Sequence, residues 1–261
     1  MRRVLIPTDF SETSLNAARF AAQMLAGKKD VSAFLYHNYK HPGDCENCID
    51  YLENLKKEFL EKGVASVEYE TEMGGDLVEK LDRLAHQKRA SVIVMGITGH
   101  SAMHDIFIGS NTLSMVNHSI CPVMIVPPDA NYTDIKNVAF ASEFRDVKKT
   151  TPVVFIKSVL EMFKPFLHIV NVNPEHYVAL TEEYQQERAK MVEMFSEYEK
   201  EFYFIGMNDF YEAIDNFIRD YHIDLLLTVP RHHKNITALF KSSHTRKLAY
   251  HSHVPFLAVH E

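Results

Sequence analysis

One stretch, residues 91 to 126, constrains the fold of this chain more than any other. It opens with Val92-Ile93-Val94-Met95, an apolar run that is short and β-branched enough for a buried parallel strand. Glycines follow at 96, 99 and 109, and an amphipathic segment then leads to a second apolar run at 123–126. Glycines let backbone N–H groups approach an anion, and a helix N-terminus adds a favourable dipole. The stretch therefore predicts a strand, a glycine loop and a helix N-terminus that together cradle a phosphate.

An internal repeat sets the expected domain organisation. A shift of 133 residues aligns 92–127 with 225–260 without a gap, with 8 identities in 36 positions and a matched hydrophobic pattern. A shift of 134 residues aligns 4–10 with 138–144. The length of 261 residues also favours two domains over one. We therefore expect a tandem duplication, with one domain at 1–129 and a second at 134–261.

Strand and helix patterns alternate in both halves. In the first half, strands are predicted at 3–7, 31–37, 66–73, 92–95 and 123–126, with helices at 11–25, 48–62, 76–86 and after Gly109. In the second half, strands are predicted near Val138, Leu167, Phe202, Leu225 and Phe256, with long helices at 147–163 and 174–200. This alternation predicts the α/β class, as two tandem doubly wound domains with five-stranded parallel sheets. In such sheets, ligands bind at the carboxyl ends of the strands where the strand order reverses.

Composition excludes several classes of function. The net charge is −7, divided as −4 up to residue 129 and −3 beyond it, so neither half has the basic character expected of a nucleic-acid-binding domain. No apolar run approaches the roughly 18 residues of a membrane span. Three cysteines and the lack of an export signal predict a cytoplasmic protein.

Two motifs together resemble the universal stress protein family in its nucleotide-binding form. They are Val-Leu-Ile-Pro-Thr-Asp at 4–9 and Gly96-x2-Gly99-x9-Gly109-Ser110, the latter followed by a Cys-Pro-Val strand at 121–123. The resemblance covers both halves and implies tandem Rossmann-like domains of the adenine-nucleotide α-hydrolase-like type. It implies that ATP or a related adenine nucleotide, with or without magnesium, binds in the first domain. The residues that it places around the nucleotide are Pro7, Thr8, Asp9, Asn38, Met95, Gly96, Gly99, His100, Gly109, Ser110 and Asn111.

Within this set, the resemblance assigns Asp9 to the adenosine and the end of the second strand, at Asn38, to the adenine. The family often has an apolar residue at the position of Asn38. Between Ala90 and Pro128 there is no lysine or arginine, so backbone amides and the Ser110 hydroxyl would have to bind the phosphates. The chain also lacks a Walker loop, which favours modest affinity. The alternative is that the glycines only build turns and Asp9 only caps a helix.

The second half departs from the nucleotide-binding pattern. The positions of Asp9, Gly96, Gly99 and Gly109 are occupied by Glu143, Val229, His232 and Ser242, so we expect no nucleotide in this half. Residues 225–260 instead hold five lysines or arginines, six histidines and no acidic residue. Two readings stay open: a solvated basic loop, or a site for an anion or an acidic partner. The residues of that second reading are Arg231, His232, His233, Lys234 and Ser243.

A Cys45-x2-Cys48 pair is the remaining candidate site. With His37 and His41 nearby, it could complete a zinc site, form a redox disulfide at a helix start, or have neither role. Cys121, before a buried strand, is expected to be structural.

Three functions remain open from the sequence. The first is a non-catalytic stress-response module that senses an adenine nucleotide and signals to a protein partner. The second is slow ATP hydrolysis or phosphoryl transfer at the same site, for which Asp9, His100, His104 and Asp105 are available without a diagnostic spacing. The HIGH and SGGxDS signatures of related nucleotide enzymes are absent. The third is an interaction protein with a vestigial nucleotide site.

The resemblance also implies an assembly. In the family, the last strands of two domains pair. Residues 123–126 and 256–259 would then form an intramolecular pseudo-dimer that covers both edges, and two chains could pair further as a homodimer.

Overall fold

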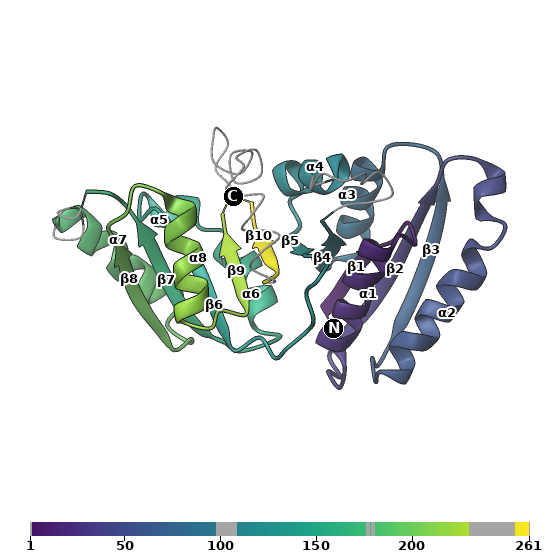
Figure 1. Ribbon diagram of the computed structural model, residues 1–261, viewed down its shortest axis with the longest axis horizontal. Helices are drawn as coiled ribbons and strands as arrows, with labels where there is room; N and C mark the ends of the chain where they lie inside the picture. The colour runs from purple at the N-terminus through teal and green to yellow at the C-terminus, as the bar shows by residue number, and fades with distance from the viewer. Residues whose placement is uncertain (1, 98–108, 176–177, 179–180, 230–253, 261) are drawn as a thin grey trace. The chain divides into compact units, whose positions relative to one another are not determined.

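The computed structural model describes residues 2–97, 109–175, 178, 181–229 and 254–260. It divides into two compact units, Met1–Tyr132 (unit 1) and Thr133–Glu261 (unit 2), and the division falls between residues 129 and 134, where the two expected domains meet (Figure 1). Among the described residues, no helix is long and apolar enough to cross a membrane.

Unit 1 is a five-stranded parallel sheet in the order β3-β2-β1-β4-β5. Its strands are β1 (Arg2–Pro7), β2 (Val31–Tyr39), β3 (Val67–Met73), β4 (Ala90–Gly96) and β5 (Val123–Val126). Its helices are α1 (Glu12–Leu25), the short 3-10 helix η1 (Pro42–Cys45), α2 (Cys48–Glu61), α3 (Leu77–Lys88) and α4 (Ser110–His118).

Unit 2 repeats the same strand order, β8-β7-β6-β9-β10, again with parallel pairing. Its strands are β6 (Asn137–Ala141), β7 (Phe166–Val172), β8 (Lys200–Ile205), β9 (Leu225–Thr228) and β10 (Phe256–Ala258). Its helices are α5 (Val147–Thr150), α6 (Val153–Leu160), α7 (Glu182–Met194) and α8 (Phe210–Asp220). The α/β, doubly wound class predicted from the alternating pattern is confirmed.

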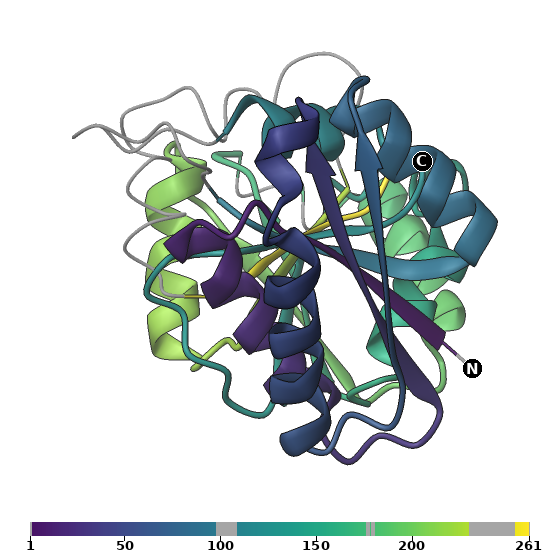
Figure 2. The same cartoon turned by 90° about the vertical axis from the view of Figure 1, so that its right-hand side faces the viewer.

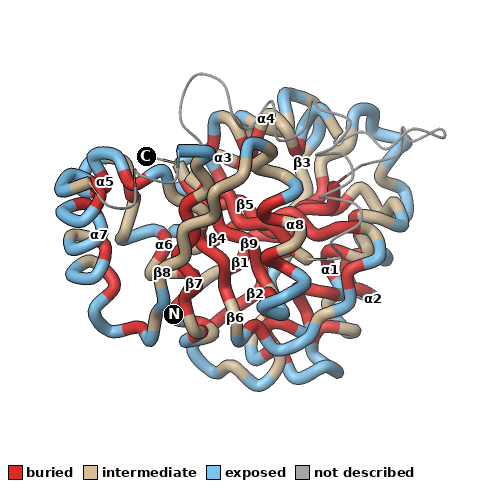
Figure 3. Tube along the Cα trace, turned by 60° about the vertical axis from the view of Figure 1, so that its left-hand side comes forward, coloured by how far each residue is buried: buried red, intermediate tan, exposed pale blue. Residues whose placement is uncertain are grey.

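Helices cover both faces of the unit 1 sheet, which is why its central strands are apolar on both sides. Figure 2 shows α1 and α2 on one side of these strands and α3 on the other. Residues 4–7 of β1 and residues 92–96 of β4 are buried throughout (Figure 3). A polar side chain at the carboxyl end of β1 or β4 is therefore held by a rigid framework.

The same turn follows the first strand of each unit. In unit 1, Phe10 has a left-handed backbone, with φ of 62°, and its N–H donates to Thr8 Oγ1 at 3.0 Å. In unit 2, Phe144 has φ of 52° and its N–H donates to Ser142 Oγ at 3.3 Å. A left-handed aromatic residue is uncommon, so its occurrence at both aligned positions indicates a local structure that the two units share.

The predicted ranges of the two long helices in unit 2, 147–163 and 174–200, are wrong. The 147–163 segment breaks into α5 and α6 around Thr151, because Pro152 has no N–H to donate and is the N-cap of α6. In the described part of the 174–200 segment, the α-helix is α7, which starts after its N-cap Thr181. Helix α8 was not predicted, although Asp209 caps it by accepting from the N–H groups of Tyr211 and Glu212.

Candidate functional site

The strand order places a switch point at the carboxyl ends of β1 and β4. Strand β1 pairs with β2 on one side and with β4 on the other, so the connections after β1 and after β4 leave the sheet in opposite directions. Asp9 follows β1 by two residues, and Gly96 ends β4. The structure thus brings two of the predicted site residues to the same edge.

Asp9 shapes the turn that starts α1. Its Oδ1 accepts hydrogen bonds from the Ser11 N–H at 3.0 Å and from Ser11 Oγ at 2.5 Å. Ser11 is itself the N-cap of α1, with its Oγ accepting from the Ser14 N–H. The helix cap is therefore Ser11, and Asp9 positions that cap through Oδ1.

Gly96 is required by packing within unit 1. A Cβ at this position would lie 2.7 Å from the Thr13 carbonyl oxygen, a distance that real Cβ atoms do not reach. The first turn of α1 therefore packs directly on the end of β4. This result supports the structural alternative for Gly96, namely that the glycine is needed by the fold itself.

Helix α4 begins at the same edge of the sheet. The Gly109 N–H donates to the Ile97 carbonyl at 2.8 Å, and the buried Thr112 donates through Oγ1 to the Gly96 carbonyl at 3.0 Å. Gly109 is the N-cap and contributes no side chain, while Ser110 and Asn111 are exposed in the first turn. The first turn of α4 is therefore tied to the end of β4, with a polar, side-chain-poor start.

A cavity of about 340 Å³ opens beside the turn after β1. Phe10, His37 and Tyr51 give it an aromatic wall: the Phe10 ring centroid lies 4.6 Å from that of His37 and 5.2 Å from that of Tyr51. His37 Nδ1 lies 2.8 Å from the Thr8 carbonyl oxygen, which fixes the imidazole. The full lining is Asp9, Phe10, His37, Asn38, Tyr39, Lys40, Gly43, Asp44, Glu46, Asn47, Cys48 and Tyr51.

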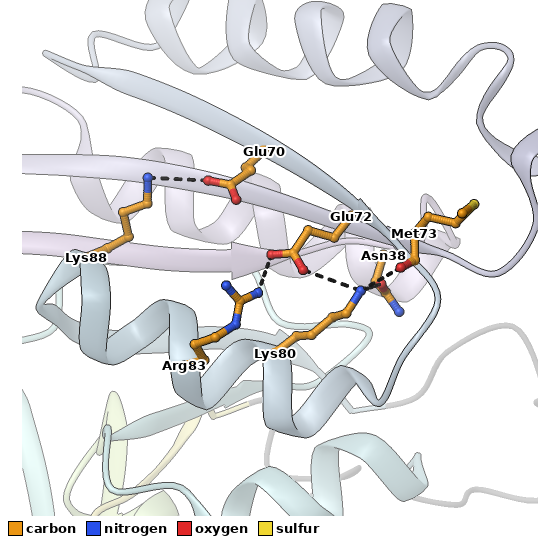
Figure 4. Close-up of polar contacts among 7 residues, drawn as sticks. All are labelled: Asn38, Glu70, Glu72, Met73, Lys80, Arg83 and Lys88. Carbon is orange, nitrogen blue, oxygen red and sulfur yellow. Dashed lines mark hydrogen bonds and ion pairs between the residues drawn. The ribbon is translucent and has the colours of Figure 1, made fainter.

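Asn38 is held in place by a lysine from α3 (Figure 4). Lys80 Nζ donates to Asn38 Oδ1 at 3.0 Å and to the Met73 carbonyl at 2.9 Å, and forms an ion pair with Glu72 at 3.4 Å. Because an ammonium group can only donate, the amide oxygen of Asn38 must face Lys80. The amide nitrogen is therefore the end of the Asn38 side chain that remains for a ligand.

The same charged network borders a buried tyrosine. Arg83 pairs with the second oxygen of Glu72 at 2.5 Å, and Lys88 pairs with Glu70 at 3.4 Å. Tyr36 is aligned with Glu70 in the pairing of β2 with β3 and is fully buried. Burial, reinforced by the Glu72 carboxylate, raises the pKa of Tyr36, so its phenol stays neutral.

The two cysteines of the Cys-x2-Cys pair form a disulfide, Cys45–Cys48, between η1 and α2. Sulfur atoms bonded in this way are not metal ligands. Among the described residues, no group of three or more His, Cys, Asp or Glu is placed to hold a metal ion. Cys121 is separate: its Sγ donates to the Ala90 carbonyl, and burial raises the pKa of its thiol to about 12.

Most of the predicted nucleotide residues that the structure describes gather at this edge, but their environments differ. Pro7 and Thr8 are buried supports, and Met95 lies within β4, paired with Ile125, and is buried in the core. Gly99 and His100 lie outside the described residues, as do His104, Asp105 and the basic segment at 230–253. Sequence reasoning missed Phe10, Tyr51 and Lys80. Their apolar or charged patterns are ordinary for surface helices and turns, and only the fold places them at the cavity.

Comparison with known proteins shows which family the chain resembles. The model of the universal stress protein family matches residues 45–127. A curated universal stress protein of Methanocaldococcus jannaschii is 29% identical over 141 residues, which cover 48% of this chain and 81% of the relative. Residues 45–127 are therefore similar to the universal stress protein family.

Solved structures share the fold over the whole length of this chain. A universal stress protein from Archaeoglobus fulgidus DSM 4304 aligns with a TM-score of 0.69 at 17% identity, covering 99% of this chain and 96% of its own. A functionally unknown protein from Pseudomonas aeruginosa PAO1 aligns with a TM-score of 0.65 at 13% identity, covering 100% and 92%. At these identities the similarity establishes the fold alone. Any ligand has to be inferred from the residues of the site.

Proposed function

We propose that unit 1 binds ATP or a related adenine nucleotide and acts as a non-catalytic sensor in a stress response. The observation that carries this proposal is the aromatic cavity at the carboxyl ends of β1 and β2, on the sheet edge where α4 begins. Nucleotides combine a flat apolar base with anionic phosphates, and this edge offers a separate environment for each.

The cavity suits the base and the sugar. Its volume of about 340 Å³ falls at the lower end of the range for small-molecule sites. Phe10 and Tyr51 supply aromatic surface for the base, and the Asn38 amide nitrogen, turned from Lys80, can donate to a ring nitrogen. Asp9 lines the same cavity and can accept from ribose hydroxyls.

The start of α4 suits the phosphates. Backbone N–H groups of the first helical turn have no partner within the helix and bear the positive end of its dipole. Gly109 lets a ligand approach them closely, and Ser110 adds a hydroxyl. Binding without a lysine clamp should be modest in affinity, which is appropriate for a sensor that must release its ligand.

The described residues favour sensing over catalysis. Phosphoryl transfer uses carboxylates that hold a metal and a placed base. In the described part of the site, Asp9 is already engaged in the α1 turn, and no acidic cluster of three accompanies it. Slow hydrolysis remains the alternative function, and His100, His104 and Asp105 lie outside the described residues.

The test uses Asp9→Asn, because the amide keeps an oxygen for the Ser11 N–H while it removes the charge. Glu143→Gln, at the aligned position of unit 2, is the matched control. We expect purified wild type and Glu143→Gln to release an adenine nucleotide on denaturation, detected by mass spectrometry, and to bind added ATP in calorimetry. Asp9→Asn should lose roughly tenfold or more in affinity, the loss of a charged hydrogen bond of about 1.5–3 kcal/mol.

Equal affinity in wild type and Asp9→Asn would show that the β1 turn does not contact the nucleotide. Absence of ATP binding in wild type, Asp9→Asn and Glu143→Gln would contradict the proposal that unit 1 binds an adenine nucleotide. Phosphate release that disappears in Asp9→Asn would favour the hydrolytic alternative.

A further inference from the structure

The Cys45–Cys48 disulfide lies in the wall of the same cavity. Cys45 is the last residue of η1, Cys48 is the first residue of α2, and their Cα atoms are 4.7 Å apart, within the usual range for bonded cysteines. Cys48 lines the cavity directly, together with Gly43, Asp44, Glu46 and Asn47 from the segment that precedes it. A change in this segment therefore changes the cavity.

The hydrogen bonds that hold η1 lie within its own turn. The Asp44 N–H donates to the His41 carbonyl, and the His41 N–H donates to Asp44 Oδ2, both at 2.9 Å and both within the η1 turn. Asn47, the N-cap of α2, makes no capping hydrogen bond with its side chain. The disulfide is thus a second covalent link, besides the main chain through Glu46 and Asn47, between the η1 wall and the buried first turn of α2.

The two sulfur atoms differ in access. Cys45 is partly exposed, whereas Cys48 is only 2% exposed and begins a helix. An incoming thiolate can therefore reach Cys45, and the leaving Cys48 thiolate lies at a helix N-terminus, which favours its negative charge. This asymmetry of an open attack position and a stabilised leaving group is what fast thiol–disulfide exchange requires.

We propose that Cys45–Cys48 is a redox-active disulfide that dithiol reductants open, and that its state sets the shape of the adjoining cavity. One thiolate of the dithiol attacks Cys45 Sγ, the S–S bond breaks, and its electron pair leaves on Cys48. In the mixed disulfide, the first sulfur of the dithiol is bonded to Cys45. The second thiolate of the dithiol attacks that first sulfur, and the electron pair of the broken S–S bond leaves on Cys45. The dithiol is oxidised to a cyclic disulfide, the two cysteines are reduced, and the two protons of the dithiol end on Cys45 and Cys48.

The consequence for nucleotide binding rests on the proposed function. The closed disulfide preorganises the η1 wall, whereas the reduced segment must be ordered when a ligand binds. The oxidised protein is therefore the tighter binder, by roughly three- to tenfold, because the reduced segment must lose conformational freedom on binding that the closed disulfide has already removed. Oxidation would then increase nucleotide occupancy of the sensor.

The first experiment counts thiols in the full chain. The protein is equilibrated with oxidised or reduced dithiothreitol, then denatured and alkylated, and intact mass gives the number of adducts. We use dithiothreitol because Asp44, Glu46 and Asp50 would repel an anionic thiol. We expect one adduct, on Cys121, in the oxidised sample and three in the reduced sample, with the change reversed on reoxidation. Three adducts under both conditions, or a disulfide that native protein keeps in excess dithiothreitol, would overturn the proposal.

The second experiment follows the cavity without a nucleotide. The chain has no tryptophan, so a Tyr51→Trp variant places a single fluorophore in the cavity lining. Its emission should shift between the oxidised and reduced protein and should not respond in a Tyr51→Trp/Cys45→Ser variant. Phe155→Trp, at an exposed position of α6 in unit 2, is the matched control and should not shift. Unchanged Tyr51→Trp emission despite a change in thiol count would overturn the link to the cavity.

The third experiment repeats the ATP titration in both redox states, with Cys121→Ser as a control that keeps the disulfide. Tighter binding to the oxidised protein supports the proposal, and equal affinity in the two states overturns its effect on ligand binding. Loss of ATP binding in both states would count against the nucleotide function alone, because the thiol counts and the emission shift do not depend on ATP.

Discussion

At the scale of single residues, some features of the nucleotide motif are explained by the fold before any ligand is considered. Gly96 packs against Thr13, and Asp9 holds the cap of α1. A variant at either position can therefore lose function through lost structure. Separating the two effects requires substitutions that the structure predicts to be structurally neutral, as Asp9→Asn is.

Gly96→Ala should destabilise unit 1 by about 1–3 kcal/mol, the usual cost of overpacking, because its Cβ would meet backbone that cannot move alone. Gly43→Ala is the matched control: its Cβ would meet no atom within 4 Å. Urea denaturation followed by circular dichroism measures both. Equal midpoints for Gly96→Ala and wild type would mean that α1 does not pack on the end of β4 as described.

Lys80→Met should weaken nucleotide binding by roughly three- to tenfold, because Asn38 would lose the contact that orders its side chain. Lys88→Met is the control, since Lys88 also bridges α3 to β3 but contacts Glu70 and the Phe34 ring. Calorimetric titration with ATP compares the two. A similar loss in both variants would indicate a general effect of the α3 charges and no role for Asn38.

At the scale of elements, the sequence predicts strands better than helices. Strands such as β4 and β9 are short apolar runs whose burial on both faces leaves a clear pattern. The helix between β6 and β7 was predicted as continuous because its apolar spacing continues through Pro152, where the missing N–H breaks it. The contact from Lys80 to Asn38 joins residues 42 positions apart and depends on how α3 lies on the sheet, so no local pattern contains it.

His168 in β7 should make the stability of unit 2 depend on pH. Burial lowers the pKa of this imidazole, although the Glu201 carboxylate opposes the effect. The ring lies 3.1 Å from the Tyr203 hydroxyl and 3.2 Å from Asn137 Oδ1. The pKa of His168 in the folded protein lies below the ordinary value of about 6.5, so the neutral ring stabilises the fold fully above about pH 6.5. This stabilisation is lost as the pH falls through the folded pKa, by about 1.4 kcal/mol for each pKa unit between the unfolded and the folded protein.

We therefore expect the urea concentration at which unit 2 is half unfolded to decrease as the pH is lowered from 7.5 to 5. Urea denaturation at each pH measures it. His168→Gln should flatten this dependence, whereas His222→Asn, at an exposed turn of the same unit, should keep it. Parallel pH profiles for wild type and His168→Gln would contradict the assignment.

At the scale of the whole molecule, the two units share a framework and differ in the residues expected at the ligand. The strand order and the left-handed turn at Phe10 and Phe144 recur in both units. Asn171 Nδ2 donates to the Ser142 carbonyl at 2.8 Å, as His37 contacts that of Thr8 at the aligned position. The residues expected at the ligand, by contrast, have diverged, with Glu143 at the position of Asp9 and Val229 at that of Gly96. A fold is maintained by many contacts, whereas a binding site is lost through a few substitutions.

This divergence predicts that a nucleotide stabilises unit 1 and leaves unit 2 unchanged. A ligand at 100 times its dissociation constant stabilises the folded form that binds it by about 2.7 kcal/mol. Hydrogen exchange resolved by peptide separates the units: amides in β1 and β4 that exchange through global unfolding of unit 1 should slow up to about 100-fold with ATP. Amides in β6 and β9 should exchange at the same rate with and without ATP, and Asp9→Asn should remove the protection in β1 and β4. Equal protection in both units would instead mean either that the two units unfold as one cooperative body or that unit 2 also binds ATP. The Glu143→Gln variant distinguishes these two explanations, because it weakens the protection only if unit 2 contains a second site.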